Sequence, residues 1–446
     1  MINFSTISEH WTKFSFLNRM KKNISDDFFL AIRPLVYVSR VLGLAPFAYV
    51  KKTLPDGRKW EQIEISSPAL LYSFFVIVSY LCFILSSIIL KKNFVFIYMS
   101  QTEVAFDILL HIASISSLVS LALSVSTNRN TIARIMYMIA KIDFIILKSS
   151  GEYYKKAKIS LTVQLFVIFL ILGFKVTYDF ITWGSEHGIT VLLYSHIHID
   201  TLIEWIFLIQ FVNMVLLLKD RFSLLNAHLY ILSGISENDN SMEGFYLSSL
   251  KRACTINVKE FKSQLTQKDV LTFNSTHDTL LDVMFLVKST YEVQILFSLL
   301  STFVGTTVWS YFGLCFLYGY SSRGMNGINA SNIVACTMIW SILHISKLFF
   351  ITVPCHLANN NMEHTSTVLR KILLAHHTDR ATMSELERFA HHVALRKFKF
   401  TVFGFLSLDL SLLVSMTGAV ATYLVILVQF EMASKVSPAC SKNVTA

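Results

Sequence analysis

Residues 68–90 read "PALLYSFFVIVSYLCFILSSIIL", an apolar run without a single charged side chain. A helix that crosses the hydrocarbon core of a bilayer, roughly 30 Å thick, needs about 20 such residues because it rises about 1.5 Å per residue. Pro68 suits the first turn of such a helix, where its missing N–H leaves no hydrogen bond unmade. The stretch therefore predicts a membrane-spanning helix.

Further stretches along the chain meet the same criterion of length and apolarity. They are 102–127, 159–183, 190–218, 292–320, 332–356 and 401–430. The whole chain of 446 residues is 53% hydrophobic and only 15% charged, with a mean hydropathy of +0.53. These values are far from those of soluble domains. We therefore expect an all-α polytopic membrane protein with seven transmembrane helices.

The basic residues indicate how the spans are oriented. Most of the 39 lysines and arginines lie in segments 1–67, 128–158, 219–290 and 357–400, which fall on one side of the predicted membrane. By the positive-inside bias, the N-terminus is cytosolic and the C-terminus is extracellular. This orientation is opposite to that of a G-protein-coupled receptor. It also explains the net charge of +10 better than binding to nucleic acid does.

The spans divide the chain into segments. Helices one to four occupy 68–218 and helices five and six occupy 291–356. We expect a cytosolic N-terminus over 1–67, a cytosolic insert over 219–290, cytosolic helices over 357–400 and an extracellular tail over 431–446. Residues 29–50 are apolar but contain two arginines and two prolines, which are costly in mid-bilayer. We interpret them as an interfacial or re-entrant helix.

Enzyme chemistry is not indicated. The chain has no phosphate-loop, dinucleotide, hydrolase or zinc-protease signature. The adjacent histidines at 376–377 and 391–392 would point about 100° apart on a helix, which disfavours a shared metal ion. We therefore predict no enzyme activity, no cofactor and no metal. A transporter is disfavoured because no internal repeat is apparent.

Polar and aromatic residues gather at the predicted outer ends of the spans. An ionisable group in hydrocarbon costs several kcal/mol unless it faces a cavity or a partner. We therefore expect an outward-facing pocket for a small molecule. The alternative is an aromatic belt at the membrane boundary combined with polar contacts between helices. The candidate ligand-binding residues are Glu103, Asp107, His111, Tyr178, Asp179, Tyr194, His198, Asp200, Trp309 and Trp340.

The last span ends in "GAVATYLVILVQF" (418–430). Its Thr-Tyr pair, five hydrophobic residues and Gln-Phe pair resemble the signature of the insect gustatory receptor family. Two further stretches look similar to that family, "SRVLGLAPFAYV" (39–50) and "VPCHLA" (353–358). The latter looks more like fructose-type receptors, whereas the residues before 418 look more like the non-sugar branch, so the branch stays open.

The resemblance implies a cation channel in the cell membrane of gustatory neurons that is gated by a small-molecule tastant without a G protein. It implies a tetramer of identical or related subunits, in which 401–430 is the pore helix. The cytosolic parts 219–290 and 357–400 would form an anchor domain that joins the subunits. The ligand pocket would be extracellular and formed by the second to sixth spans of each subunit, with 68–218 on the ligand-pocket side.

Helical spacing assigns roles within the last span. Thr422 and Gln429 are two turns apart and share one face, and Tyr423 and Phe430 share the adjacent face. We predict that the first face lines the pore, that Leu427 or an apolar neighbour closes it, and that Gln429 offers neutral dipoles to a weakly selected cation. The alternative for Gln429 is a position at the external headgroup level with its amide in water.

Two points remain open from sequence. The chain matches a tastant receptor, but an accessory subunit, or a thermal- or light-sensing channel subunit without its own tastant, would have the same layout. Asn329 and Asn443 lie in sequons on the predicted outside and are candidate glycosylation sites.

Overall fold

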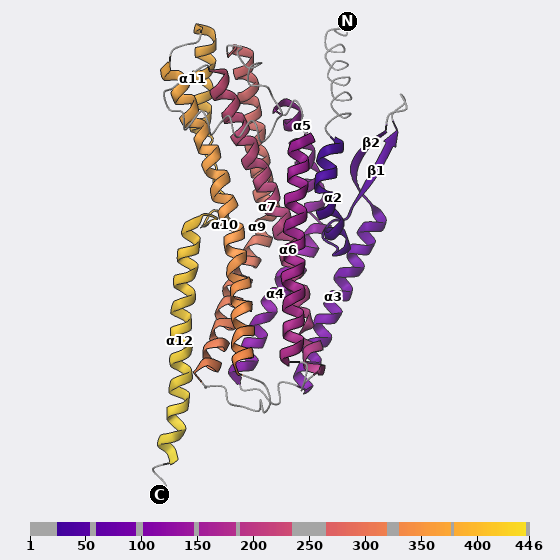
Figure 1. Ribbon diagram of the computed structural model, residues 1–446, viewed down its shortest axis with the longest axis vertical. Helices are drawn as coiled ribbons and strands as arrows, with labels where there is room; N and C mark the ends of the chain where they lie inside the picture. The colour runs from indigo at the N-terminus through magenta and orange to yellow at the C-terminus, as the bar shows by residue number, and fades with distance from the viewer. Residues whose placement is uncertain are drawn as a thin grey trace.

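The protein forms an elongated bundle of long helices (Figure 1). The computed structural model describes residues 25–53, 59–94, 101–146, 151–183, 188–233, 265–318, 330–375 and 379–442. The helices are α2 (Ser25–Val41), α3 (Ser67–Phe94), α4 (Gln101–Val125), α5 (Asn128–Ile146), α6 (Gly151–Trp183), α7 (Gly188–Leu232), α9 (Gln267–Leu317), α10 (Ala330–Ala375), α11 (Arg380–Leu395) and α12 (Leu410–Lys442).

Seven of these helices are long and apolar enough to cross a membrane, namely α3, α4, α6, α7, α9, α10 and α12. They follow the order of the seven predicted spans, so the expected fold class is confirmed. Three of them are much longer than a bilayer requires. α7, α9 and α10 continue without a break past the expected span limits at 218, 291 and 356. The segments flanking these spans therefore begin or end as extensions of the same helices.

The two ends of the bundle differ (Figure 1). α11 lies at one end, beside the extensions of α9 and α10, and α12 extends beyond the bundle at the other. We call these the α11 end and the α12 end. α4, α7 and α10 run toward the α11 end, whereas α6 and α9 run toward the α12 end. The start of α4, the end of α6 and the starts of α7 and α10 therefore lie together at the α12 end.

The helix expected over 29–50 is shorter in the structure. α2 ends at Val41, and the chain turns at Gly43, whose φ of 79° suits a residue without a Cβ atom. Strands β1 (Phe47–Thr53) and β2 (Lys59–Ile65) then form an antiparallel hairpin in which Phe47 pairs with Ile65. The aromatic and β-branched residues after Pro46 favour this strand.

The last helix begins later and ends later than expected. A second hairpin, β3 (Thr401–Val402) and β4 (Leu406–Ser407), precedes it. Asp409 accepts hydrogen bonds from the backbone N–H (3.0 Å) and hydroxyl (2.5 Å) of Ser411, which lower the pKa of its carboxyl group. α12 runs from Leu410 to Lys442, so the segment expected as a tail after 430 begins as helix.

α11 is joined to α9 by a charged contact. The guanidinium group of Arg396, which follows α11, donates to Asp278 at 2.9 Å and to Asp282 at 2.8 Å, one turn apart on α9. The hydrogen bond to Asp282 is the largest of the effects that raise the pKa of Arg396. These two hydrogen bonds hold the end of α11 against α9, at the point where the chain continues to β3.

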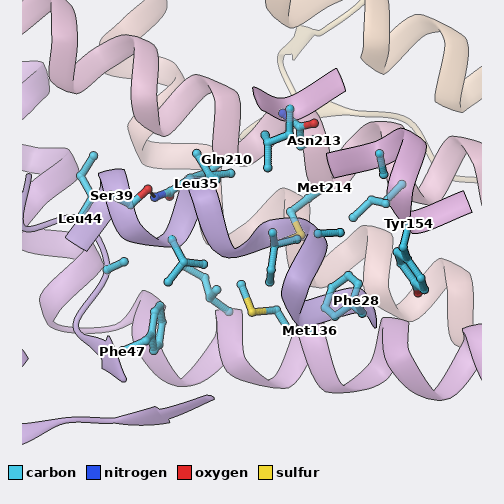
Figure 2. Close-up of a pocket in the computed structure, with 18 of the residues that line it drawn as sticks. Phe28, Leu35, Ser39, Leu44, Phe47, Met136, Tyr154, Gln210, Asn213 and Met214 are labelled. Carbon is cyan, nitrogen blue, oxygen red and sulfur yellow. Dashed lines mark hydrogen bonds between the residues drawn. The ribbon is translucent and has the colours of Figure 1, made fainter. Parts of the chain in front are cut away.

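α2 fills a groove formed by α5, α6 and α7. Figure 2 shows its side chains, among them Phe28 and Leu35, packed toward Met136 of α5 and Met214 of α7. The space left is an apolar cavity of about 60 Å³. This volume is too small for a ligand of ordinary size. Gln210 donates to Ser39 across its edge at 2.7 Å.

A buried ion pair joins the helices beside this cavity. Arg221 on α7 is fully buried and donates twice to Asp143 on α5, at 2.7 Å each. Tyr153 on α6 accepts a further hydrogen bond from Arg221 at 2.5 Å, and Tyr154 donates to Asp143. The guanidinium group thereby fixes α5, α6 and α7 relative to one another.

Replacing Asp143 tests this interaction. Asp143→Asn keeps the side-chain shape but leaves Arg221 as an unpaired buried charge, so we expect a loss of about 3–5 kcal/mol of stability. Thermal unfolding of the purified protein in detergent measures this loss. Lys219→Gln, which removes a partly exposed pair with Asp220, is the matched control and should cost less than about 1 kcal/mol. Equal losses of stability in the two variants would show that the buried pair stabilises the fold no more than the exposed pair does.

Candidate functional site

Most of the candidate ligand residues lie near the α12 end, where several helices begin or end. They form two groups of directly contacting side chains. The first involves α3, α4 and α7, and the second involves α6, α7, α9 and α10. The side chain of Glu103 and the sequon residues Asn329 and Asn443 lie outside the residues whose side chains are described.

The first group centres on an ion pair between α3 and α4. Lys91 lies 3.1 Å and 3.3 Å from the two carboxylate oxygens of Asp107. The same ammonium group lies 3.8 Å from the ring centre of Tyr194, a cation–π contact with α7. His111 stacks on His196 with 5.0 Å between ring centres. The group therefore joins three helices.

The second group centres on Asp179 of α6. Its carboxylate pairs with Lys175 one turn earlier and accepts a hydrogen bond from the Cys336 thiol of α10 at 2.8 Å. Nε2 of His198, on α7, lies 3.4 Å from the second carboxylate oxygen. Lys175 also lies 4.7 Å from the ring centre of Trp340. One carboxylate thus organises polar groups from three helices.

An aromatic wall completes this group. Trp340 of α10 stacks on Trp309 of α9 with 5.4 Å between ring centres and 12° between planes. The ring centres of His198 and Trp340 are 5.4 Å apart. Nε1 of Trp309 and Nδ1 of His198 have no hydrogen-bond partner within the described part of the chain. Both nitrogens are buried and the two indole faces are stacked, so a ligand that stacks and hydrogen bonds here must separate the two rings.

These two groups are partly accessible. The side chains of Asp179, His111 and His198 are 10%, 14% and 19% exposed. Tyr178 lies at the margin, where its hydroxyl donates to the Asn332 carbonyl at 3.4 Å. Asp200 differs from the other candidates because it is completely buried, and its carboxylate accepts a hydrogen bond from Ser114 of α4 at 2.6 Å. It lies deeper in the bundle.

α12 contacts the bundle along one face. Leu424, Leu427 and Val428 pack against a small apolar cluster that includes Phe106 and Tyr311. Thr422 and Gln429 are exposed. In helical projection their shared face lies opposite the packed one. The structure therefore keeps Thr422 and Gln429 together, as the spacing predicts, but it places Leu427 on the other side.

Two aromatic residues flank the packed face. Tyr423 contacts Phe303 of α9 edge to face, with 5.7 Å between ring centres, and Phe430 is 71% exposed. The hydroxyl of Tyr311 on α9 donates to Glu431 at 3.1 Å. In the apolar stretch of α12 that could cross a membrane, only 6% of the residues are buried by the rest of the chain, whereas in α7 the share is 72%. α12 is thus attached mainly through α9.

A family model described as "7tm Chemosensory receptor" matches residues 32–434. The chain belongs to this family. Together with the seven apolar helices, this makes the receptor a multi-pass membrane protein.

Curated relatives of the receptor are gustatory receptors of Drosophila melanogaster. "Gustatory and pheromone receptor 32a" is 30% identical over 105 residues, which are 24% of this chain and 22% of the relative. "Gustatory receptor for sugar taste 43a" is 24% identical over 156 residues, 35% of this chain and 34% of the relative. The matched regions span about a third of these relatives or less.

Solved structures share the receptor's fold. The insect olfactory receptor OR5 from Machilis hrabei superposes with a TM-score of 0.61 at 12% identity, over 90% of this chain and 97% of that one. Its complex with eugenol gives a TM-score of 0.54 at 12% identity, over 91% and 100%. The arrangement of helices is therefore the same in outline.

Several residues of the site were not predicted as ligand residues. Lys91 follows an apolar run and reads as a loop charge, yet it is 1% exposed and pairs with Asp107. Cys336 reads as a small apolar residue, yet its thiol donates to Asp179. The Lys175 and Asp179 pair has a sequence signal, the spacing of one helical turn between opposite charges. No such signal exists for contacts between helices.

Close packing of α9 on α10 supports the stacked indole rings of Trp309 and Trp340. A Cβ atom at Gly305 would lie 2.5–2.7 Å from the ring atoms of His344, one turn from Trp340. Gly305→Ala is therefore expected to displace His344 and to cost about 1–3 kcal/mol in thermal unfolding. Gly173→Ala on α6 meets nothing within 4 Å and is the control. It should stabilise its helix by roughly 0.5–1 kcal/mol. Equal stability of the two variants would contradict this account of the packing.

Proposed function

We propose that this receptor is a tastant-gated, non-selective cation channel in the cell membrane of gustatory neurons. The observation that supports it most is the combination of a partly exposed polar and aromatic site with an apolar helix, α12, that stands at the margin of its own bundle. A helix so little covered by its own chain is suited to line an axis shared with other subunits. The names of the two Drosophila relatives support taste as the stimulus.

The ligand site is the second group, formed by Asp179, His198, Trp309 and Trp340. Positive residues favour a cytosolic α11 end, which places this group toward the outside. Stacked indoles bind flat or ring-shaped molecules by their faces, and the free nitrogens of Trp309 and His198 supply hydrogen bonds. A sugar or a planar organic molecule of similar size fits this chemistry.

The pore is lined by the exposed face of α12 in a tetramer of identical or related subunits. Thr422 and Gln429 lie on that face, and in helical projection Val425 and Ile426 flank the same face. Leu427 faces α9. The apolar constriction therefore belongs to Val425 or Ile426, while Gln429 offers amide dipoles to the passing ion. The extensions of α7, α9 and α10 with α11 form the cytosolic anchor.

α9 couples the two sites. It contributes Trp309 to the aromatic wall, and it contacts α12 through Phe303 and Tyr311. A ligand that separates Trp309 from Trp340 displaces α9, and α9 displaces α12. The contact of the Phe403 backbone N–H with Glu292 extends this coupling to the hairpin that precedes α12.

The ligand site is tested by current recording in oocytes with a panel of sugars and alkaloids. Trp340→Ala and Asp179→Asn should each raise the half-maximal concentration of an active tastant by about tenfold or more, as expected for loss of a contact worth about 1.4 kcal/mol. Phe180→Ala, adjacent to Asp179 but 63% exposed on the outer face of α6, is the control and should leave it unchanged.

Unchanged dose responses in both site variants would exclude this ligand site. Current that requires a co-expressed relative, whatever the tastant, would instead support an accessory subunit. Current evoked by heat or light without any tastant would support the corresponding sensor.

The pore assignment is tested with Gln429→Leu. Loss of the amide ring is expected to lower single-channel conductance and to change the permeability ratio of potassium to sodium, with the half-maximal tastant concentration unaltered. Met432→Leu, an apolar exchange of similar volume on the same helix, is the matched control. Identical conductance and permeability in Gln429→Leu and wild type would remove the residue from the pore wall.

A further inference from the structure

The buried charges of the bundle are unequal in number. Among the described residues, five carboxylates are buried, Asp107, Asp143, Asp179, Asp200 and Glu204, and four basic side chains other than histidine, Lys91, Lys175, Arg221 and Lys347. Each basic side chain pairs with one carboxylate. Asp200 is left without a cationic partner. A buried unpaired carboxylate is expensive in a membrane and demands a neutralising partner.

The charged neighbours of Asp200 do not supply that partner. Lys347 is paired with Glu204, one turn from Asp200 on α7. His344 lies one turn from Lys347 on α10, and its ring packs against Gly305 of α9. Asp200 accepts a hydrogen bond from Ser114 through one oxygen, and its other oxygen, Oδ1, has no partner in the described part of the chain.

Hydroxyl groups of α4 and α9 lie at the same depth. Gln294 of α9 donates to the Ser120 carbonyl of α4 at 3.1 Å, which sets the register of the two antiparallel helices. One turn from this contact toward the α12 end are Ser298 on α9 and Ser116 on α4, and a further turn along are Ser301 and Thr302. The hydroxyls of all four are buried without a partner within the described residues.

A second contact sets the register of α9 relative to α10. Gly305 of α9 contacts His344 of α10, so Lys347, one turn toward the α11 end, lies at the level of Ser301 and Thr302. Ser114 and Ser117 of α4 both donate to Asp200, through its carboxylate and its carbonyl. By these register points, the unpaired carboxylate oxygen of α7 and the unpaired hydroxyls of α4 and α9 lie at a similar depth among α4, α7, α9 and α10.

We propose that the oxygens at this depth bind a sodium ion, with the carboxylate of Asp200 and hydroxyl oxygens of Ser301, Thr302 and their neighbours as ligands. Oxygen donors suit a hard cation. One positive charge balances the single unpaired carboxylate, whereas a divalent ion would leave an excess. The site has no exposed side chain, since Asp200, Glu204 and Lys347 are at most 1% exposed, which excludes a bulky organic cation. A proton would neutralise Asp200 but would leave the hydroxyl oxygens unused.

The test measures thermal unfolding of the purified full-length receptor in detergent, in sodium chloride and in choline chloride at equal ionic strength and fixed pH. Sodium should raise the unfolding temperature of the wild type in a saturable way, because an ion that binds only the folded state stabilises it by mass action. Asp200→Asn should lose this shift. It should also be more stable than the wild type in choline, because the unpaired charge is gone.

Two further variants complete the test. Thr302→Val keeps the shape and removes one oxygen ligand, so it should raise the sodium concentration needed for half of the shift. Asp282→Asn, in the exposed contact of α9 with Arg396, should lower stability equally in both salts and keep the sodium shift. An equal shift in the wild type and Asp200→Asn would overturn the proposal. So would a wild type that sodium does not stabilise and that only acidification stabilises, since the partner of Asp200 is then a proton. The measurement needs no tastant and no current, so it stands apart from the proposed channel function.

Discussion

The structure depends on the pairing of charges inside an apolar bundle. A charged side chain in hydrocarbon is tolerated only beside an opposite charge or a dense set of hydrogen bonds, because the surroundings cannot solvate it. Lys91 with Asp107 joins α3 to α4, Arg221 with Asp143 joins α7 to α5, and Lys347 with Glu204 joins α10 to α7. A shift of α3, α4, α5 or α10 by one turn would leave two charges without partners, and a shift of α7 would leave four. The pairs therefore set the register of helices whose apolar surfaces alone would slide.

The same requirement explains where the candidate ligand site lies. Lys175 and Asp179 pair within α6, which leaves their remaining hydrogen-bonding capacity free for other helices. Cys336 from α10 and His198 from α7 use that capacity, and Trp340 lies against the ammonium group. These contacts bring α6, α7 and α10 to one point near the α12 end, where the side chains of Asp179 and His198 are partly exposed. Deeper in the bundle the same kind of chemistry is closed to anything larger than an ion.

Apolarity and charge bias were enough to predict the number and order of the helices and the end at which the polar residues gather. Each span exceeds the length that a bilayer requires, and alternating direction brings the correct helix ends together. Partners across helices were not predictable, because residues such as Lys91 and Cys336 have no periodic relation to the residues they contact. The start of α12 was predicted wrongly because residues 401–407 are as apolar as the membrane-spanning helix that follows them. The turn between β3 and β4 is marked only by Phe403 and Gly404, which both have a positive φ. The depth of Asp200 depends on the register of four helices, which no single stretch contains.

The spacing within α12 has a consequence for the ion that would pass. Glu431 is the one acidic residue between Leu410 and Lys442, and it lies two positions after Gln429, about 200° around the helix. Its carboxylate accepts a hydrogen bond from Tyr311 of α9, on the face that packs against the bundle. The opposite face therefore presents Thr422 and Gln429, which are neutral, together with apolar residues. In a pore built from that face, an ion meets amide and hydroxyl dipoles instead of a ring of carboxylates. Such dipoles replace water around a monovalent cation without holding a divalent one tightly, so monovalent cations are selected only weakly against one another.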